Sequence, residues 1–374
     1  MRTLTGREPG CLLARPIPIP HLAGSGRQRR VADVTHDQAV ALSLAPALSR
    51  VGLTARLQQS DPTLLELANA YLPSVAECRR RAAAGCIESV PWNAPEFPQL
   101  LLATPDCPPA LWYRGDLAVL LEPAVAIVGS RAATAVAHEI ATTIATELAA
   151  KGVIVVSGLA RGVDSAAHRG ALTRGRTVAV LGSGPDRIYP GEHVALAAEI
   201  ALTGLLLSEY PPGTPPLPFH FPQRNRLISG LSLAVVVIEA AEGSGSLITA
   251  ACALEQGREV MAVPGNALTG RNRGGHALIR DGAKIVESAD DIVDELGLAS
   301  GPPATERPDV MERSARRDPL LAVMDEGETY DLDALTATLG ISGARLLARL
   351  LELELQGIVR RVGGGRFIRP GRTC

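Results

Sequence analysis

The residues best suited to bind a polyanion lie between Tyr210 and Ile238. This stretch contains no aspartate or glutamate, although the whole chain carries 39 of them. It does contain Phe219, Phe221 and the run Arg224–Arg226. Aromatic rings stack on flat bases, guanidinium groups bind phosphate, and a segment without carboxylates does not repel a polyanion. The composition favours a nucleic-acid groove; the alternative is a proline-rich loop whose rings fill the core and whose arginines face water.

A second phosphate-type signal follows directly. Residues Leu233–Ile238 have the composition of a buried strand, and the chain then continues through glycines and serines to Thr249. Glycines and serines between a strand and a helix present backbone N–H groups that form an anion cradle. Two anion-binding signals therefore lie next to each other in the sequence.

The elements that must position these residues follow a regular pattern from Ala124 onward. Short apolar, β-branched runs alternate with amphipathic helical segments, which is typical of a parallel sheet covered on both faces. The predicted strands are Val125–Val128, Val153–Val156, Thr177–Leu181, Leu205–Leu207, Leu233–Ile238, Glu259–Ala262 and Lys284–Val286. The predicted fold class is α/β, with a Rossmann-like, doubly wound, mostly parallel sheet.

The ligand of such a sheet is expected at the carboxyl ends of its strands. The loops there are polar and rich in glycine: Gly129–Arg131, Ser157–Gly162, Gly182–Asp186 and the Ser244 loop. None of them completes the G-x-G-x-x-G pattern of dinucleotide sites, and the chain contains no Walker-type phosphate loop. We therefore expect no cofactor.

Bulk properties narrow the class of protein without naming a partner. The 374 residues have a formal net charge of −2, so binding to nucleic acid must rest on a local patch. The six cysteines form no C-x-x-C pair, so we expect no metal site. The sequence has no secretion signal and no apolar run long enough for a membrane span, so a cytoplasmic protein is expected.

Changes in residue composition and periodicity along the chain predict five segments. Residues 1–35 have no period and are predicted to be a disordered extension. Residues 36–109 are predicted to form a small helical domain with a proline-punctuated connector from Pro91 to Pro109, and Asp61 and Pro62 are suited to begin a helix. Residues 110–297 hold the sheet, 298–317 a linker, and 318–374 a winged-helix domain with a glycine-rich hairpin at Val362–Ile368 as its wing. From Ile341 to Cys374 this domain has seven arginines against two glutamates. A basic winged helix serves duplex DNA contact or protein interaction equally well.

Eight motifs in order resemble those of the DprA/Smf family of DNA-processing proteins. They are Gly129–Arg131; Ser157–Asp164 with Ala167 and His168; Asp186–Pro190; Ser208–Thr214; Phe221–Arg226 with Gly230–Ser232; Ser244–Thr249; Ala253–Val260; and Ala262–Gly265. The resemblance covers roughly residues 110–297. It implies an extended Rossmann fold that binds single-stranded DNA, forms a homodimer and helps to load the RecA recombinase in natural transformation, without catalysis.

The resemblance also implies which residues contact DNA. Arg131 matches the family's phosphate-binding arginine, and Phe221–Asn225 with Arg226 match its nucleic-acid-facing motif. The full predicted DNA-binding set is Gly129, Ser130, Arg131, Arg161, Phe221, Arg224, Asn225, Arg226, Ser244, Gly245, Ser246 and Thr249. Asp164 and His168 are interpreted as structural, and no catalytic residue is assigned.

Two features stand apart from this reading. The chain has Gly275-His276 where the family has a small residue and asparagine. The alternative function is a nucleotide-binding enzyme of the phosphoribohydrolase type, whose glycine-rich loop places a glutamate at the start of the catalytic helix. Here Thr249 stands at that position, so the site lacks the carboxylate that general acid–base chemistry needs.

Overall fold

The computed structural model divides into two compact units, one ending at Gly297 and the other beginning at Leu298. The structure describes residues 34–46, 48–50, 52–298, 320, 323–324, 329–339, 343, 346–347, 350, 353, 359–362 and 366–368. Residues 1–33 of the expected N-terminal extension and all but Leu298 of the expected linker lie outside these residues. Among the described residues, no helix is long and apolar enough to cross a membrane.

The first unit is built around a nine-stranded sheet in the order β1-β2-β6-β5-β4-β3-β7-β8-β9. Its strands are β1 (Glu88–Pro91), β2 (Ala110–Gly115), β3 (Ala124–Val128), β4 (Ile154–Ser157), β5 (Thr177–Val180), β6 (Leu205–Ser208), β7 (Ala234–Val237), β8 (Glu259–Ala262) and β9 (Lys284–Ile285). The seven strands from β3 to β9 are parallel, whereas β1 and β2 are antiparallel. The predicted mostly parallel, doubly wound sheet is confirmed.

The sheet extends beyond the predicted strands. The connector expected at Pro91–Pro109 joins β1 to β2, and β2 pairs with β6, with Trp112 opposite Ser208. The sheet therefore begins at residue 88 rather than in the region after residue 109. The reason is physical: β1 has one buried residue and ends in proline, and β2 is buried only in its first half, so neither shows the buried β-branched run that marked the central strands.

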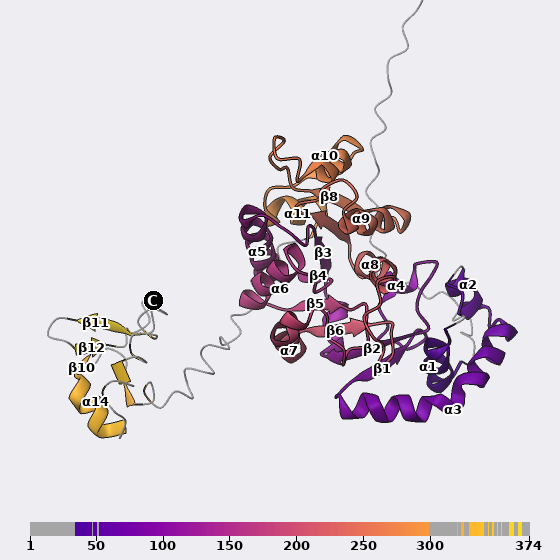
Figure 1. Cartoon of the computed structure of the whole chain (residues 1–374), viewed down its shortest axis with the longest axis horizontal. Coiled ribbons are helices and arrows are strands. Elements are labelled where there is room, and N and C mark those ends of the chain that lie inside the picture. Colours follow the sequence, from indigo (N-terminus) through magenta and orange to yellow (C-terminus); the bar gives the residue numbers. More distant parts are fainter. Residues whose placement is uncertain are drawn as a thin grey trace, which may run out of the picture. The chain divides into compact units, whose positions relative to one another are not determined.

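Helices cover both faces of the sheet. Figure 1 shows α5, α6 and α7 on one face and α8 and α9 on the other. The helices of this unit are α1 (His36–Leu44), α2 (Leu53–Gln58), α3 (Pro62–Ala84), α4 (Gln99–Leu102), α5 (Ala135–Ala150), α6 (Val163–Arg174), α7 (Val194–Thr203), α8 (His220–Gly230), α9 (Gly245–Glu255), α10 (Arg273–Arg280) and α11 (Ala289–Glu295), with the short 3-10 helices η1 (Leu117–Leu121) and η2 (Gly191–His193). Because of this cover, every residue of β3 to β7 is buried.

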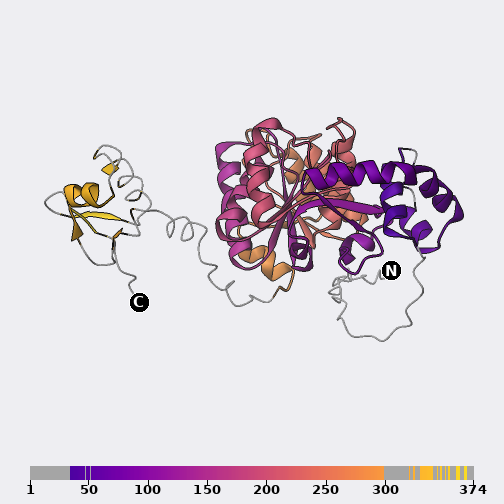
Figure 2. The ribbon, with the colours of Figure 1, turned by 90° about the horizontal axis from the view of Figure 1, so that it is seen from below.

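The N-terminal helices pack on the β1–β2 end of the sheet, as both views show (Figures 1 and 2). Asp61 caps α3 by accepting the Thr63 N–H, with Pro62 as the first helical residue, as the sequence predicted. Side chains of α1 and α2 share one core with the sheet, including Leu42, Leu57 and Trp112. The helical segment is thus held to the sheet by continuous apolar packing.

The second unit contains a three-stranded sheet in the order β10-β12-β11 and the helix α14. Its elements are β10 (Thr329–Tyr330), α14 (Leu332–Leu339), β11 (Arg360–Val362) and β12 (Arg366–Ile368). Leu335, Leu346 and Phe367 belong to its small core. The antiparallel β11–β12 pair stands where the sequence predicted the wing of a winged helix.

Candidate nucleic-acid interface

The loop after β3 carries Gly129, Ser130 and Arg131. The Ser130 N–H donates to the Glu239 carbonyl (2.7 Å), which fixes this loop to the end of β7. A methyl group at Gly129 would lie 2.6 Å from Cγ2 of Val163, so only glycine lets α6 approach this closely. The strand order reverses between β3 and β7, where ligands of doubly wound sheets bind. Arg131 projects from this point and is exposed.

Three side chains, two from loops and one from the first turn of α8, meet above this edge, and we call them the Phe221 platform: Arg131, Tyr189 and Phe221. The guanidinium carbon of Arg131 lies 5.7 Å from the centre of the Phe221 ring. The Tyr189 and Phe221 ring centres are 5.4 Å apart with a 47° tilt between their planes. Tyr189 is 46% exposed and Phe221 is half-buried. The platform therefore offers a cation and two accessible rings within one small area.

The sequence analysis placed Tyr189 in the Asp186–Pro190 motif but assigned it no binding role. The signal that could have found it is the aromatic residue itself, in a loop at a strand end of a protein with 3% aromatic residues. Its position beside Phe221 depends on how two distant loops fold together. That proximity is not visible in the sequence.

The loop after β4 is held in a conformation that its sequence does not favour. Leu159 has φ +57°, a left-handed conformation that costs free energy for a residue with a branched side chain. Its N–H donates to Nε2 of His168 (3.3 Å), and its carbonyl accepts from Nδ1 of His193 (2.9 Å). Asp164 accepts the N–H groups of Gly158 (3.1 Å) and Ala160 (3.3 Å). Buried side chains thus determine the shape of this loop.

His168 is neutral in this arrangement. It is fully buried, and burial together with the charge of Arg224 lowers its pKa to about 3. The Thr177 hydroxyl donates to the Val155 carbonyl (2.6 Å), so it accepts from Nδ1 of His168 (2.8 Å). This leaves Nε2 as the acceptor for Leu159 and fixes the tautomer. The structural role that the sequence analysis gave to His168 agrees with this hydrogen-bond pattern.

Arg224 lies beneath the edge rather than on it. The residue is 3% exposed, and a methyl group at Gly158 would lie 1.6 Å from its Nη1. Its Nε and Nη1 are buried and have no hydrogen-bond partner among the described residues. Burial lowers the pKa of Arg224 to about 10, a shift that Asp164 opposes and Arg131 increases. A buried cation whose N–H groups lack hydrogen-bond partners is stabilised when an anion binds nearby.

The buried carboxylate of Asp164 does not neutralise the positive charges of Arg131 and Arg224. Burial raises the pKa of Asp164 although Arg224 and two backbone N–H groups favour its charged form. Arg131 and Arg224 together carry two positive charges against the single carboxylate. The N-terminus of α6, at Val163, adds the partial positive charge of a twelve-residue helix. These three side chains and the helix end thus carry a net positive charge; the buried Glu239 carboxylate also lies on this side of the sheet, where it accepts from the Thr134 hydroxyl (2.8 Å).

The serine-rich loop after β7 is ordered by its own hydroxyl groups. Ser244 caps α9 by accepting the Ser246 N–H (3.4 Å), and the two hydroxyl groups lie 2.8 Å apart. Asn225 of α8 donates to the Gly245 carbonyl (3.2 Å), which ties this loop to the helix that carries Phe221. Gly245 is exposed, whereas Ser246 and Thr249 are buried. In this loop, Gly245 offers the most accessible contact.

Two of the predicted binding arginines already have carboxylate partners. Arg226 is 7% exposed, and its guanidinium is bound by Glu209 and Asp106 (Nε to Oδ2, 3.2 Å). This pairing leaves the buried Arg226 guanidinium occupied by two carboxylates, which a phosphate would have to displace. Arg161 is exposed but holds both oxygens of Glu192, at 2.7 and 2.8 Å. A phosphate would have to compete with that carboxylate.

The departure at Gly275-His276 is explained by a local contact. Nε2 of His276 lies 3.1 Å from the Gly265 carbonyl in the loop after β8. The buried Asn272 accepts the Ala240 N–H (2.9 Å) and donates to the Val263 carbonyl (3.0 Å). Asn272 thus joins the ends of β7 and β8, and the His276 imidazole contacts the loop after β8.

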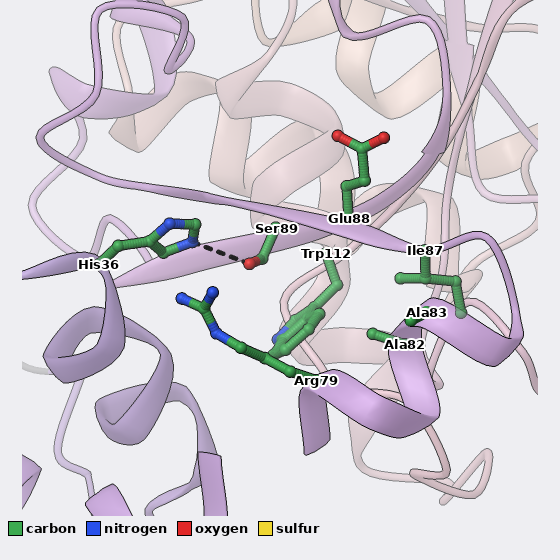
Figure 3. Close-up of a pocket in the computed structure, with 8 residues that line it drawn as sticks. All are labelled: His36, Arg79, Ala82, Ala83, Ile87, Glu88, Ser89 and Trp112. Atoms are coloured by element: carbon green, nitrogen blue, oxygen red, sulfur yellow. Dashed lines mark hydrogen bonds between the residues drawn. The ribbon is translucent and has the colours of Figure 1, made fainter. Parts of the chain in front are cut away.

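A cavity of about 280 Å³ lies elsewhere, between the N-terminal helices and β1 and β2 (Figure 3). His36 and Ser89 are hydrogen-bonded there (2.9 Å), next to Arg79 and above Trp112. None of the site residues predicted from the sequence lines this cavity. In the described parts of the chain, no cluster of His, Cys, Asp and Glu is suited to a metal ion.

Comparison with known proteins places this geometry in a family. Residues 88–297 match the family model of DNA recombination-mediator protein A, and residues 302–365 match the DprA winged helix domain. The chain is 42% identical over 293 residues to Protein Smf of Escherichia coli, covering 76% of this chain and 78% of that protein. It is 43% identical over 212 residues to the DNA processing protein DprA of Bacillus subtilis, covering 56% of this chain and 71% of that protein.

Solved structures agree with the sequence relatives. DNA processing protein A of Streptococcus pneumoniae superimposes with a TM-score of 0.57 at 36% identity, covering 71% of this chain and 94% of that one. DNA processing protein A of Helicobacter pylori, whose structure was described for its single-stranded DNA binding mode, gives a TM-score of 0.52 at 31% identity, with coverage of 56% and 95%. The resemblance inferred from the motifs is confirmed, and the chain belongs to the DprA/Smf family of DNA-processing recombination mediators.

Proposed function

We propose that this protein binds single-stranded DNA at the strand-end edge between β3 and β5, with Arg131 on a phosphate and a base stacked on Phe221. The observation that carries the proposal is the Phe221 platform above Arg224. An exposed guanidinium lies 5.7 Å from an accessible ring, over a buried arginine whose Nε and Nη1 have no hydrogen-bond partner in the described part of the chain. Single-strand binding combines a positive groove with stacking rings, which is the pairing found here.

The roles of the remaining predicted residues follow from where they lie. Gly129 and Ser130 bring Arg131 to the edge, and Gly245 offers an exposed backbone at the start of α9. Ser244, Ser246, Thr249 and Asn225 shape that second loop. Arg224 acts from below, through its charge and by supporting Gly158. Phosphates thus rest on two loops, and the base lies between them.

The downstream role in this proposal is that of a recombination mediator without catalytic chemistry. The protein, as a homodimer, delivers bound single strands to the RecA recombinase. The position of Thr249 supports a non-catalytic role, because its hydroxyl cannot replace the glutamate of the phosphoribohydrolases. Release of a free base from a nucleoside monophosphate by the purified protein would contradict this part of the proposal.

The test of DNA binding is fluorescence anisotropy of a labelled oligonucleotide, single-stranded and duplex, across a salt series. Arg131→Ala should weaken single-strand binding and lower the slope of log affinity against log salt by roughly 0.7, the contribution of one phosphate contact. Arg80→Ala is the matched control, because that exposed arginine lies on α3, pairs with Glu77 and is not among the predicted DNA-binding residues. Equal losses in both variants, or no binding by wild type, would contradict the proposed site.

The RecA step needs a separate measurement. RecA hydrolyses ATP when it assembles on single-stranded DNA, so the lag before hydrolysis reports loading. Wild-type protein should shorten the lag on DNA covered by a single-strand-binding protein, and Arg131→Ala should not. An unchanged lag with tight DNA binding would limit the function to binding alone. Light scattering at several protein concentrations reports whether the bound species is a dimer.

A further inference from the structure

The loops after β5 and β6 form one continuous ledge beside the Phe221 platform. The Gly184 N–H donates to the Thr214 carbonyl (3.0 Å), and Oδ1 of Asp186 accepts the Gly213 N–H (2.7 Å). The ledge consists of residues 182–187 and 211–214. It begins at the platform, because a methyl group at Gly182 would lie 3.0 Å from the Phe221 ring.

The far end of the ledge touches the last turn of α3. A methyl group at Gly213, where φ is +90°, would lie 2.0 Å from Nη1 of Arg81. The guanidinium of Arg81 therefore rests directly on the backbone of the ledge. Figure 1 shows α3 at the β1–β2 end of the sheet, where β2 is the neighbour of β6. The N-terminal helical segment thus reaches the same edge that carries the Phe221 platform.

Arg81 differs from the two arginines that precede it. Arg79 pairs with Asp37, and Arg80 pairs with Glu77 one turn earlier on the same helix. Arg81 is exposed and makes no ion pair with any described residue. On the ledge itself, Arg187 is 62% exposed at its side chain and lies 4.0 Å from the carboxylate of Asp186. Two arginines thus outweigh one aspartate at this end.

The ledge also has the apolar surface that a base needs. The loop that contains Gly213 continues to Phe219, whose side chain is 58% exposed. Its edge-on contact with His220, with ring centres 4.6 Å apart, leaves the ring accessible to a base. The distance along the ledge suits a DNA single strand rather than a single nucleotide. The β-strands β3 and β6 are three inter-strand spacings apart in the sheet, roughly 14 Å. A chain of several nucleotides is needed to span it.

We propose that a DNA single strand bound at the Phe221 platform continues along the ledge and places a further phosphate on Arg81, so that α3 lengthens the binding site. This inference rests on the proposed function. It assigns the N-terminal helical segment a DNA contact that the sequence gave no reason to expect. The ligand remains a single strand, because the exposed ring of Phe219 suits an unpaired base.

The experiment compares two labelled oligothymidylates, about 4 and about 16 nucleotides long, which bracket common single-strand site sizes. Arg81→Ala should weaken binding of the longer one by roughly fivefold and lower its salt slope by roughly 0.7, while binding of the shorter one stays unchanged. Arg81→Lys should retain most of the affinity, since it keeps the charge. Arg80→Ala is the matched control, one residue away and paired with Glu77.

The outcomes separate this inference from the proposed function. If wild type binds both oligonucleotides and Arg81→Ala equals Arg80→Ala on the longer one, the ledge is not part of the path, and the platform stands. A loss of equal size on the short oligonucleotide would also contradict the extension, because Arg81 would then act on the platform. If wild type binds neither, both proposals fail. Circular dichroism verifies that the surface variants remain folded.

Discussion

The guanidinium carbon of Arg131 lies 5.7 Å from the centre of the Phe221 ring, although the two residues belong to different halves of the doubly wound sheet. Arg131 follows β3, and Phe221 lies in the first turn of α8, the helix that returns the chain to β7. Their contact places a guanidinium that can bind phosphate, and a ring on which a base can stack, beside the point where the strand order reverses. A cation–π contact at an exposed site contributes about 0.5–1 kcal/mol of interaction free energy. This contact therefore holds the Arg131 guanidinium beside the Phe221 ring before DNA binds.

Phe221→Ala should reduce affinity for single-stranded DNA through the loss of stacking. Stacking of one base on an aromatic side chain is worth about 1–3 kcal/mol, or roughly 5- to 150-fold in the dissociation constant. Phe221→Leu is the sharper variant, because it still fills space against Gly182 but has no π face. Phe221→Trp should preserve binding. Anisotropy titrations check this, and equal affinity of the Leu and Trp variants would show that packing alone matters.

Arg131 and Phe221 should be energetically coupled in DNA binding. The ring orients the guanidinium, so removing either residue removes part of the other's contribution. In a double-mutant cycle, Arg131→Ala with Phe221→Ala should lose less affinity than the sum of the single losses, by about 0.5–1 kcal/mol. Arg131→Ala combined with Tyr189→Ala provides a comparison, because Tyr189 contacts the far side of the same ring. Strict additivity at Phe221 would show that the contact has no role in binding.

The central sheet was predictable because its strands are buried on both faces. A strand such as β7, with every residue buried, must be a continuous run of apolar, β-branched residues, and the sequence shows that run. The antiparallel edge gives a weaker signal. Only the middle of β1 is buried, and that strand ends in a proline, so its pattern resembles a connector. Edge strands carry less sequence information because fewer of their side chains face the core.

The same physical difference explains which features of the site residues the sequence predicts and which it does not. Loop position after a strand is readable from the sequence, and it brought Arg131 and Ser244 to the expected edge. Side-chain direction is not readable, and three arginines of similar appearance have different surroundings: Arg161 on Glu192, Arg224 beneath Gly158, and Arg226 on Asp106 and Glu209. A local sequence cannot show which distant carboxylate a guanidinium meets.

Arg226→Ala should destabilise the fold rather than remove a DNA contact. The variant would leave the buried carboxylate of Glu209 without its closest partner, and breaking a buried ion pair from one side costs about 3–5 kcal/mol. Urea unfolding should show that loss. At temperatures where the variant is folded, its salt slope for single-stranded DNA should equal that of wild type. A flatter slope with unchanged stability would return Arg226 to the interface.

His168 should make the protein sensitive to mild acid. Its pKa is about 3 in the folded protein against 6.5 for an unperturbed histidine, so between these values the unfolded chain binds a proton that the folded chain does not. Stability is therefore complete above pH 6.5 and falls as the pH decreases below it, by about 1.4 kcal/mol for each pH unit. His168→Gln keeps a donor and an acceptor but cannot be protonated.

The free energy of unfolding, measured in urea from pH 7.5 to 5, should thus fall faster for wild type than for His168→Gln. The variant is less stable at pH 7.5, because a flexible amide replaces a ring that holds the Leu159 N–H and the Thr177 hydroxyl. The gap between the two proteins should narrow as the pH decreases. Asp164 and Arg224 are present in both proteins, so their titration cancels in the difference. Parallel curves would mean that His168 accepts its proton without opening the loop after β4.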